Sequence, residues 1–325
     1  MTNPLIQDAK RVATGITVKL PTLGKFYDET IIDTSTNVED APVGKFSVWD
    51  ETNFSDPYKI ISGEATKTFL KTVAPWIIEP MQMSRWDIEV IMAASRLASY
   101  GPKMPFEMRC ANPDETTTTK VNPDTGEETS YNTPVCGHRV MMDIDIREVI
   151  ETYAFVESTD DWMVEIDTGQ TLILQPPRYQ DELAVSRLSL ERGEMLADLG
   201  KEEEIERFSR EQILEIKDII VNKNMLSQFI FIQSCTKEVK LTTGNAVKDR
   251  THIQEWLNTL NGKQLRTIID KLEGLLSINE KAGKFDFVCP NCEYKTDDIP
   301  VIGDSIHFFG NGLQAVDQDK NNTPS

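Results

Sequence analysis

The spacing of the cysteines constrains this chain more than any other feature of its sequence. Cys289 and Cys292 form a Cys-Pro-Asn-Cys pair, and a Cys-x-x-Cys pair is typically one half of a four-ligand zinc site. Cys110, Cys136 and Cys235 complete the set. An odd number of cysteines, behind an N-terminus without an apolar signal segment, argues against a disulfide framework. We therefore expect metal binding, in a protein made and folded in a reducing cytosol.

The other half of the site is expected at Cys110 and Cys136. Each lies at the end of an alternating, strand-like segment, PFEMRC or HRVMMDIDI, and residues 111–135 between them are polar and rich in turn residues. If those residues form a projecting loop or hairpin, its two ends meet and place the sulfurs together. The sequence thus predicts one structural Zn²⁺ held by Cys110, Cys136, Cys289 and Cys292. Cys235, inside the apolar run FIFIQSC, is expected to be a buried thiol.

Two alternatives to this site stay open. One is a set of four unmetallated thiols on neighbouring strands, and the other is His138, in the sequence Cys-Gly-His, as a substitute ligand. A catalytic zinc keeps a free coordination position, which four thiolates do not leave. The metal is therefore predicted to be structural.

No other pattern in the sequence indicates catalysis. The chain has no H-E-x-x-H motif, no glycine-rich phosphate loop and no G-x-S-x-G elbow. Asp143 and Asp145 share one face of a predicted strand, but 53 acidic residues supply such pairs by chance. We expect that the protein is not an enzyme.

The net charge of −19 argues against nucleic acid as a partner, because most of that affinity comes from neutralising phosphates. The nearest candidate for a basic patch, KEVKLTTGNAVKDR, is short and is interpreted as a solvated loop between helices. No apolar run approaches the roughly 20 residues that a bilayer crossing needs.

The predicted fold class is α+β, with a mixed small-sheet domain carrying a zinc-ribbon-like site and a helical insertion or subdomain. The expected divisions are an α+β domain at 1–177 with a projecting loop at 111–135, a helical region at 178–278, a strand return at 279–311 that brings the Cys-Pro-Asn-Cys pair to the first domain, and a flexible tail at 312–325.

Several individual elements are predicted from periodicity and capping residues. Strands are expected from residue 16 and within VGKFSVWDE, and a hairpin is expected around the turn at 167–170. A helix in SGEATKTFLKTVAPWI is expected to be capped by Ser62. A second helix, MSRWDIEVIMAASRLASYG, has Ser84 and Asp87 at the spacing of a capping box and Gly101 at its end.

A series of segments resembles a known family. In chain order they are LPTLGKFYDE, DPYKIISGEATKTFLKTVAPWI, WDIEVIMAASRLASYG, CGHRVMMDIDI, LILQPPRY and FVCPNCEYKTDDIPVIGDSIHFFG. They resemble, over about residues 16–311, the baseplate hub subunits and baseplate hub assembly proteins of T-even-like contractile-tailed phages. In such relatives the first cysteine pair tends to be close together, whereas here a Thr- and Asp-rich insertion separates it.

The resemblance implies a non-enzymatic structural or assembly protein of a phage tail baseplate hub. It implies hub, tape-measure or other tail proteins as partners in an oligomeric assembly, a location in the virion tail, and the host cytoplasm during assembly. The alternative is a zinc-ribbon regulator that binds nucleic acid or a polymerase. Candidate aromatic residues for a docking surface, with ordinary core packing as the favoured interpretation of each one singly, are Phe26, Tyr27, Trp76, Phe308 and Phe309.

Overall fold

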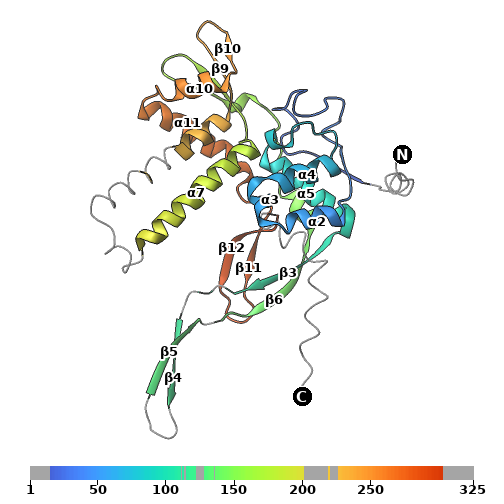
Figure 1. Cartoon of the computed structure of the whole chain (residues 1–325), viewed down its shortest axis with the longest axis vertical. Helices are drawn as coiled ribbons and strands as arrows, with labels where there is room; N and C mark the ends of the chain where they lie inside the picture. Colours follow the sequence, from blue (N-terminus) through green and yellow to red (C-terminus); the bar gives the residue numbers. More distant parts are fainter. Residues whose placement is uncertain are drawn as a thin grey trace.

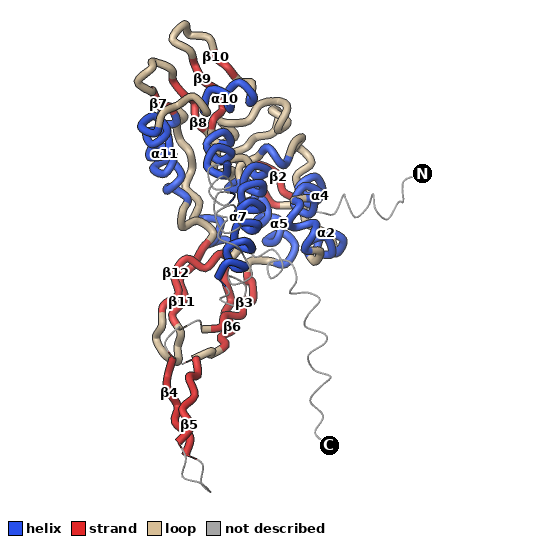
Figure 2. Tube along the Cα trace, turned by 60° about the vertical axis from the view of Figure 1, so that its left-hand side comes forward, coloured by secondary structure: helices blue, strands red, loops and turns tan. Residues whose placement is uncertain are grey.

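The protein has a body of helices and small sheets, below which paired hairpins and then a long β-ribbon project (Figure 1, Figure 2). The fold class is α+β, as predicted, and every sheet described is antiparallel. The computed structural model describes residues 15–110, 112, 115–121, 128–134, 136–200, 219 and 226–302. The predicted tail at 312–325, Phe308 and Phe309 lie outside the described residues.

The first core lies in the N-terminal half, where α4 and α5 pack with a two-stranded sheet. Phe69 and Val73 of α4, and Ile88 and Ile91 of α5, recur at helical spacing and are buried together. The elements around this core are β1 (Ile16–Val18), β2 (Ala41–Val43), α2 (Val48–Phe54), α3 (Pro57–Ser62), α4 (Glu64–Val73), η1 (Pro80–Gln82), α5 (Arg85–Tyr100) and α6 (Ile146–Glu151).

Two local predictions in this half are wrong, and both errors concern helix starts. Of the predicted strand VGKFSVWDE, only its first residue, Val43, lies in a strand, as the last residue of β2. The segment continues into α2, because Ser47 and Asp50 form a capping box that begins this helix. Ser62 ends α3 and is not the N-cap of α4. Gly63 occupies the junction with a φ of 79°, a left-handed conformation that glycine adopts without steric cost.

Asp87 departs from its predicted capping role. Ser84 does cap α5, accepting from the amide of Trp86, but the Asp87 carboxylate turns inward and is fully buried. It accepts hydrogen bonds from the Thr22 amide at 3.0 Å, from the Thr22 hydroxyl at 2.5 Å and from the Tyr27 hydroxyl. Burial raises the pKa of Asp87 to about 6 against the lowering effect of these hydrogen bonds.

The second core lies around a four-stranded sheet of order β10-β9-β8-β7. The hairpin predicted around residues 167–170 is confirmed as β7 and β8, with Gly169 at a φ of 81°. Helical residues 226–234 and the helices that follow the sheet cover this core. Its elements are η2 (Asp160–Trp162), β7 (Met163–Glu165), β8 (Thr171–Leu174), α7 (Tyr179–Gly200), β9 (Thr236–Lys240), β10 (Ala246–Val247), α10 (Arg250–Leu257), α11 (Gly262–Leu276) and η3 (Ser277–Asn279).

The helical prediction for 178–278 needs correction within this sheet. KEVKLTTGNAVKDR, interpreted as a solvated loop, contains most of β9 and all of β10, which form a hairpin that turns at Gly244, and β9 pairs with β8. Val239 alternates with polar neighbours and is buried against Leu172. This short period-two pattern forms a strand although the segments before and after it are helices. The sheet therefore crosses residue 177, while the domain division itself stays a prediction.

The loop at Pro21–Tyr27 joins the two cores. The amide of Val156 donates to the Pro21 carbonyl at 2.8 Å, and the rings of Phe26 and Trp162 meet edge to face at 5.0 Å. Because the same loop supplies Thr22 and Tyr27 to Asp87, the buried carboxylate holds the segment on which the second core packs.

Below the body, two hairpins lie beside each other and a ribbon extends from one of them (Figure 1, Figure 2). The hairpins are β3 (Lys103–Arg109) with β6 (Arg139–Asp145), and β11 (Lys284–Val288) with β12 (Lys295–Pro300). The ribbon, β4 (Glu115–Val121) with β5 (Glu128–Pro134), is the predicted projecting element between residues 111 and 135.

We expect Asp87 to make folding stability depend on pH. Its folded pKa of about 6 lies above the ordinary value of 3.8, so its stabilising contribution is present below about pH 4 and is lost as the pH rises through 6. A shift of this size corresponds to about 3 kcal/mol. In urea unfolding, the free-energy difference between wild type and Asp87→Asn should therefore fall by that order between pH 4 and 7.

The exposed Asp161→Asn is the control for the loss of one negative charge. A wild-type minus Asp87→Asn difference that stays constant with pH would contradict the assignment.

Candidate metal centre

The four predicted cysteine ligands converge on one point. The sulfurs of Cys110, Cys136, Cys289 and Cys292 all lie within 4.8 Å of one another. Cys110 with Cys292, and Cys136 with Cys289, each have an Sγ–Sγ distance of 3.5 Å. A tetrahedral zinc with Zn–S bonds of about 2.3 Å needs sulfurs about 3.8 Å apart. The four thiols are thus placed so that they could hold a metal ion.

The first pair is brought together by the β3–β6 hairpin. These strands pair from Lys103 with Asp145 to Arg109 with Arg139, and the Cys110 amide continues the ladder to the His138 carbonyl at 2.9 Å. Gly137 has a φ of 57°, which lets the chain turn between Cys136 and β6. The two ends of the inserted segment therefore meet, as the sequence predicts, and the ribbon β4–β5 extends outward between them (Figure 2).

The second pair lies on the tight turn between β11 and β12. The Cys289 amide donates to the Tyr294 carbonyl at 2.9 Å, and the Glu293 amide donates to the Cys289 carbonyl at 2.8 Å. Glu293 adopts a φ of 58° to close this turn. The Pro-Asn link between the cysteines thereby directs both sulfurs to the same side.

Packing between the two hairpins fixes the centre. Phe106 of β3 and Phe285 of β11 meet edge to face with ring centroids 5.4 Å apart. Phe287 is buried next to Cys110 and Cys289, and partly buried apolar residues surround them, including Met108, Val140, Met142, Tyr294 and Ile299. This small third core holds the sulfurs in position and limits the access of water to them.

The environments of the four thiols differ. Cys110 and Cys289 are buried, whereas Cys136 and Cys292 are half-buried. The side-chain amide of Asn291 donates to the Cys136 sulfur at 3.4 Å, and with the His138 backbone amide it lowers the pKa of that thiol to about 6. Burial raises the pKa of Cys110. The Asn112 amide lies 3.8 Å from the Cys292 sulfur.

The arrangement has the chemistry of a structural rather than a catalytic site. Thiolates are the ligands that zinc prefers in closed tetrahedral sites, and four of them leave no position for water or substrate. Among the described residues the converging ligand atoms are the four sulfurs, and the imidazole of His138 is not one of them. Cys235 lies apart, fully buried in the second core as predicted.

The acidic pair that the sequence singled out has an ordinary role in the hairpin. Asp145 caps α6 through the Arg147 amide and also pairs with the Arg147 guanidinium at 2.5 Å, which lowers the pKa of its carboxyl to about 2. Asp143 pairs with Lys103 across the hairpin at 3.9 Å.

Comparison with known proteins gives one match. The model of the T4 bacteriophage base plate protein family matches residues 16–310, which include all four converging cysteines. The chain belongs to the family of T4 bacteriophage base plate proteins. A search of curated proteins and a search of solved structures gave no match.

Family membership places this base plate protein in the virion tail, with other phage tail proteins as its partners. Among the helices described, none combines the length and the apolar character that a membrane span requires. The more specific predictions of a hub role, of zinc and of the absence of catalysis stay predictions.

Sequence reasoning missed the two asparagines at the sulfurs. Asn112 and Asn291 each lie within two residues of a cysteine, and a side-chain amide so close to a thiolate is a donor that stabilises the charged form. The closeness of these asparagines to the cysteines in sequence is the signal that could have identified them.

We expect the purified base plate protein to carry about one equivalent of zinc per chain. Cys110→Ser and Cys289→Ser should each lose the metal and lower the melting temperature, since binding free energy is folding free energy in such sites. Metal analysis and thermal unfolding check both.

Cys235→Ala is the matched control, because it removes a buried thiol outside the cluster and should keep the metal. The site would be contradicted if wild-type protein, purified under reducing conditions, contained no zinc, cobalt or iron.

Proposed function

We propose that this base plate protein is a structural or assembly protein of the baseplate hub, and that it acts by docking to other tail proteins. The match of the family model over residues 16–310 is the observation that carries the proposal. The form of the molecule supports it, since a body that carries a projecting ribbon offers contact surfaces to neighbours (Figure 1). Hub and tape-measure proteins are the proposed partners, in the virion tail and, during assembly, in the host cytoplasm.

The proposed metal is a structural Zn²⁺ in a zinc-ribbon-like site. Its ligands come from hairpins that are distant in sequence, and Cys110 and Cys136 flank the base of the ribbon. A metal there would fix the direction in which the ribbon leaves the body. The proposed metal has a structural and not a catalytic role, because four thiolates leave no coordination position for water or substrate.

The docking surface differs from the one proposed on sequence. Trp76 and Phe26 are buried, and the Tyr27 hydroxyl bonds to Asp87, so the core interpretation is correct for these three residues. Among the described residues the most exposed aromatic side chains are instead Trp49 of α2 and Tyr58 of α3, which are 69% and 77% exposed. Large exposed aromatic residues are typical anchors of protein interfaces, and we propose that α2 and α3 contribute to docking.

The competing function, a zinc-ribbon regulator of nucleic acid or a polymerase, is not favoured. Family membership points to the baseplate, and the net charge of −19 opposes binding to phosphates. A salt-dependent shift of DNA mobility at physiological ionic strength would favour the regulator.

The hub proposal predicts contacts in tail particles. Mass spectrometry of purified virions and of tail intermediates, with chemical cross-linking, should find this chain linked to hub or tape-measure proteins. A fixed ratio in finished virions indicates a structural subunit, and presence only in intermediates indicates an assembly factor. Absence from both, with normal tails when the chain is not made, would overturn the proposal.

The ribbon can be tested separately from the metal centre. Replacing residues 111–135 with a four-residue Gly/Asn link gives the first cysteine pair an ordinary knuckle spacing. We expect this variant to retain zinc and its melting temperature and to lose incorporation into tails. Unchanged incorporation would show that the ribbon takes no part in docking, and loss of zinc would show that the ribbon supports the centre itself.

A further inference from the structure

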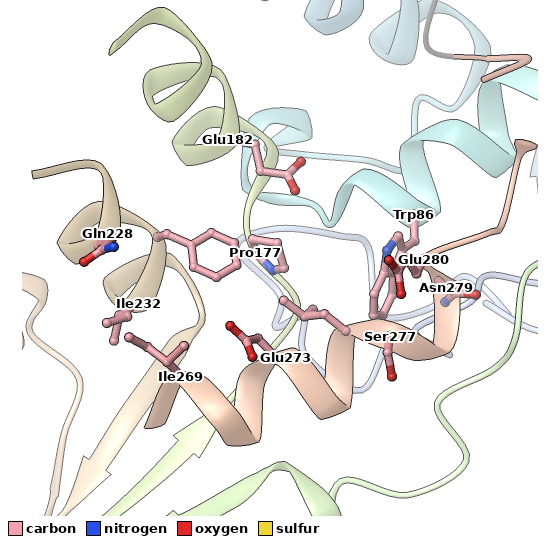
Figure 3. A pocket seen from close by; sticks show the side chains of 12 residues that line it. Trp86, Pro177, Glu182, Gln228, Ile232, Ile269, Glu273, Ser277, Asn279 and Glu280 are labelled. Atoms are coloured by element: carbon pink, nitrogen blue, oxygen red, sulfur yellow. The ribbon is translucent and has the colours of Figure 1, made fainter. Parts of the chain in front are cut away.

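A cavity with a volume of about 530 Å³ opens where α7 and α11 meet the first core (Figure 3). None of the four converging cysteines is among its lining residues. The lining side chains come from α5, the loop before α7, α7 itself, helical residues 226–234, α11, η3 and the residue that follows η3. A cavity of this size is typical of ligand sites.

The lining combines an apolar floor with negative charge. Trp86, Phe231 and the aliphatic side chains supply the floor, and three carboxylates, those of Glu182, Glu273 and Glu280, are the charged groups. No lysine or arginine is among the twelve lining residues. In Figure 3, Glu182 and Glu273 project from α7 and α11 toward the space between these helices. This chemistry suits a ligand with an apolar part and a positive charge.

Glu182 has a carboxylate oxygen without a hydrogen-bond donor among the residues described, although Arg85 is near enough to act on its charge. Its Oε2 atom is buried and has no hydrogen-bond partner in the described part of the chain. Among the described residues no guanidinium forms an ion pair with Glu182, because Arg85 pairs with Glu89 at 2.6 Å and Arg250 pairs with Asp181 at 2.8 Å. A buried carboxylate oxygen without a donor costs free energy, which a bound cation would offset.

The titration of Glu182 agrees with that geometry. Burial raises the pKa of its carboxyl to about 7, with smaller raising effects from Glu89 and Asp181, and Arg85 opposes them. A cation in the cavity would favour the charged carboxylate.

We propose that this cavity binds an arginine or lysine side chain, together with a flanking apolar residue, from a neighbouring tail protein. Charge complementarity carries the choice of partner, since the cavity has three carboxylates and the chain has a net charge of −19. The indole of Trp86 offers a face for a guanidinium, and Glu182 and Glu273 offer acceptors. The site deepens the proposed docking function and rests on it for the identity of the partner.

A tripeptide probe tests the site on the purified full-length chain. Acetyl-Leu-Arg-Leu-amide should bind in an NMR titration, and its citrulline analogue, which has nearly the same shape without the charge, should bind at least about tenfold more weakly. This comparison uses wild-type protein alone, so it does not depend on the folding of a variant. Absence of binding at millimolar concentrations, or equal binding of the two peptides, would overturn the proposal.

Matched variants locate the binding. Glu182→Gln combined with Glu273→Gln should weaken the arginine peptide about tenfold. Glu165→Gln combined with Glu255→Gln removes the same charge from exposed positions outside the cavity and should leave binding unchanged. Equal weakening by both pairs would indicate non-specific attraction to an acidic protein and overturn the assignment. Binding that survives while the chain is absent from tail particles would reject the hub function and keep the site.

Discussion

The convergence of four sulfurs is the constraint on which the lower half of the molecule depends. Cys110 and Cys136 flank the inserted ribbon, while Cys289 and Cys292 lie far along the chain on another hairpin. Closing so long a loop costs conformational entropy. The aromatic contact between Phe106 and Phe285 and the few half-buried apolar residues around it bury little surface to offset that cost. A metal ion bound by the four sulfurs would supply a strong interaction at this small core.

The body is organised by a second long-range contact, between Asp87 and the loop at Pro21–Tyr27. The carboxylate is costly to bury, and it is held by donors from one short segment. That segment also places Phe26 against Trp162, so the arrangement of the two cores relies on a polar interaction and not on apolar packing alone. The chain then returns, with Val301 and Ile302 buried in the first core after the cysteine hairpin.

Sequence patterns identified elements where the local signal was strong. Ser84 and Gly101 marked the ends of α5, and alternation around Asp167–Gln170 gave the β7–β8 hairpin. The predictions failed where a polar residue had two possible partners. Asp87 fits the spacing of a capping box, yet Thr22 and Tyr27, both more than fifty residues away, take its hydrogen bonds. Ser47 likewise starts a helix inside an apparent strand because Asp50 completes its cap.

The sequence by itself determined the four metal-ligand candidates and the resemblance to baseplate proteins, because cysteine spacing and residue identity are local properties. Only the tertiary structure decided that the sulfurs meet, that β9 pairs with β8 and that an oxygen of Glu182, a residue that lines a cavity, is buried without a hydrogen-bond donor in the described part of the molecule. Each of these depends on contacts between segments distant in sequence. Periodicity reports which face of an element is apolar, but not which distant element covers it.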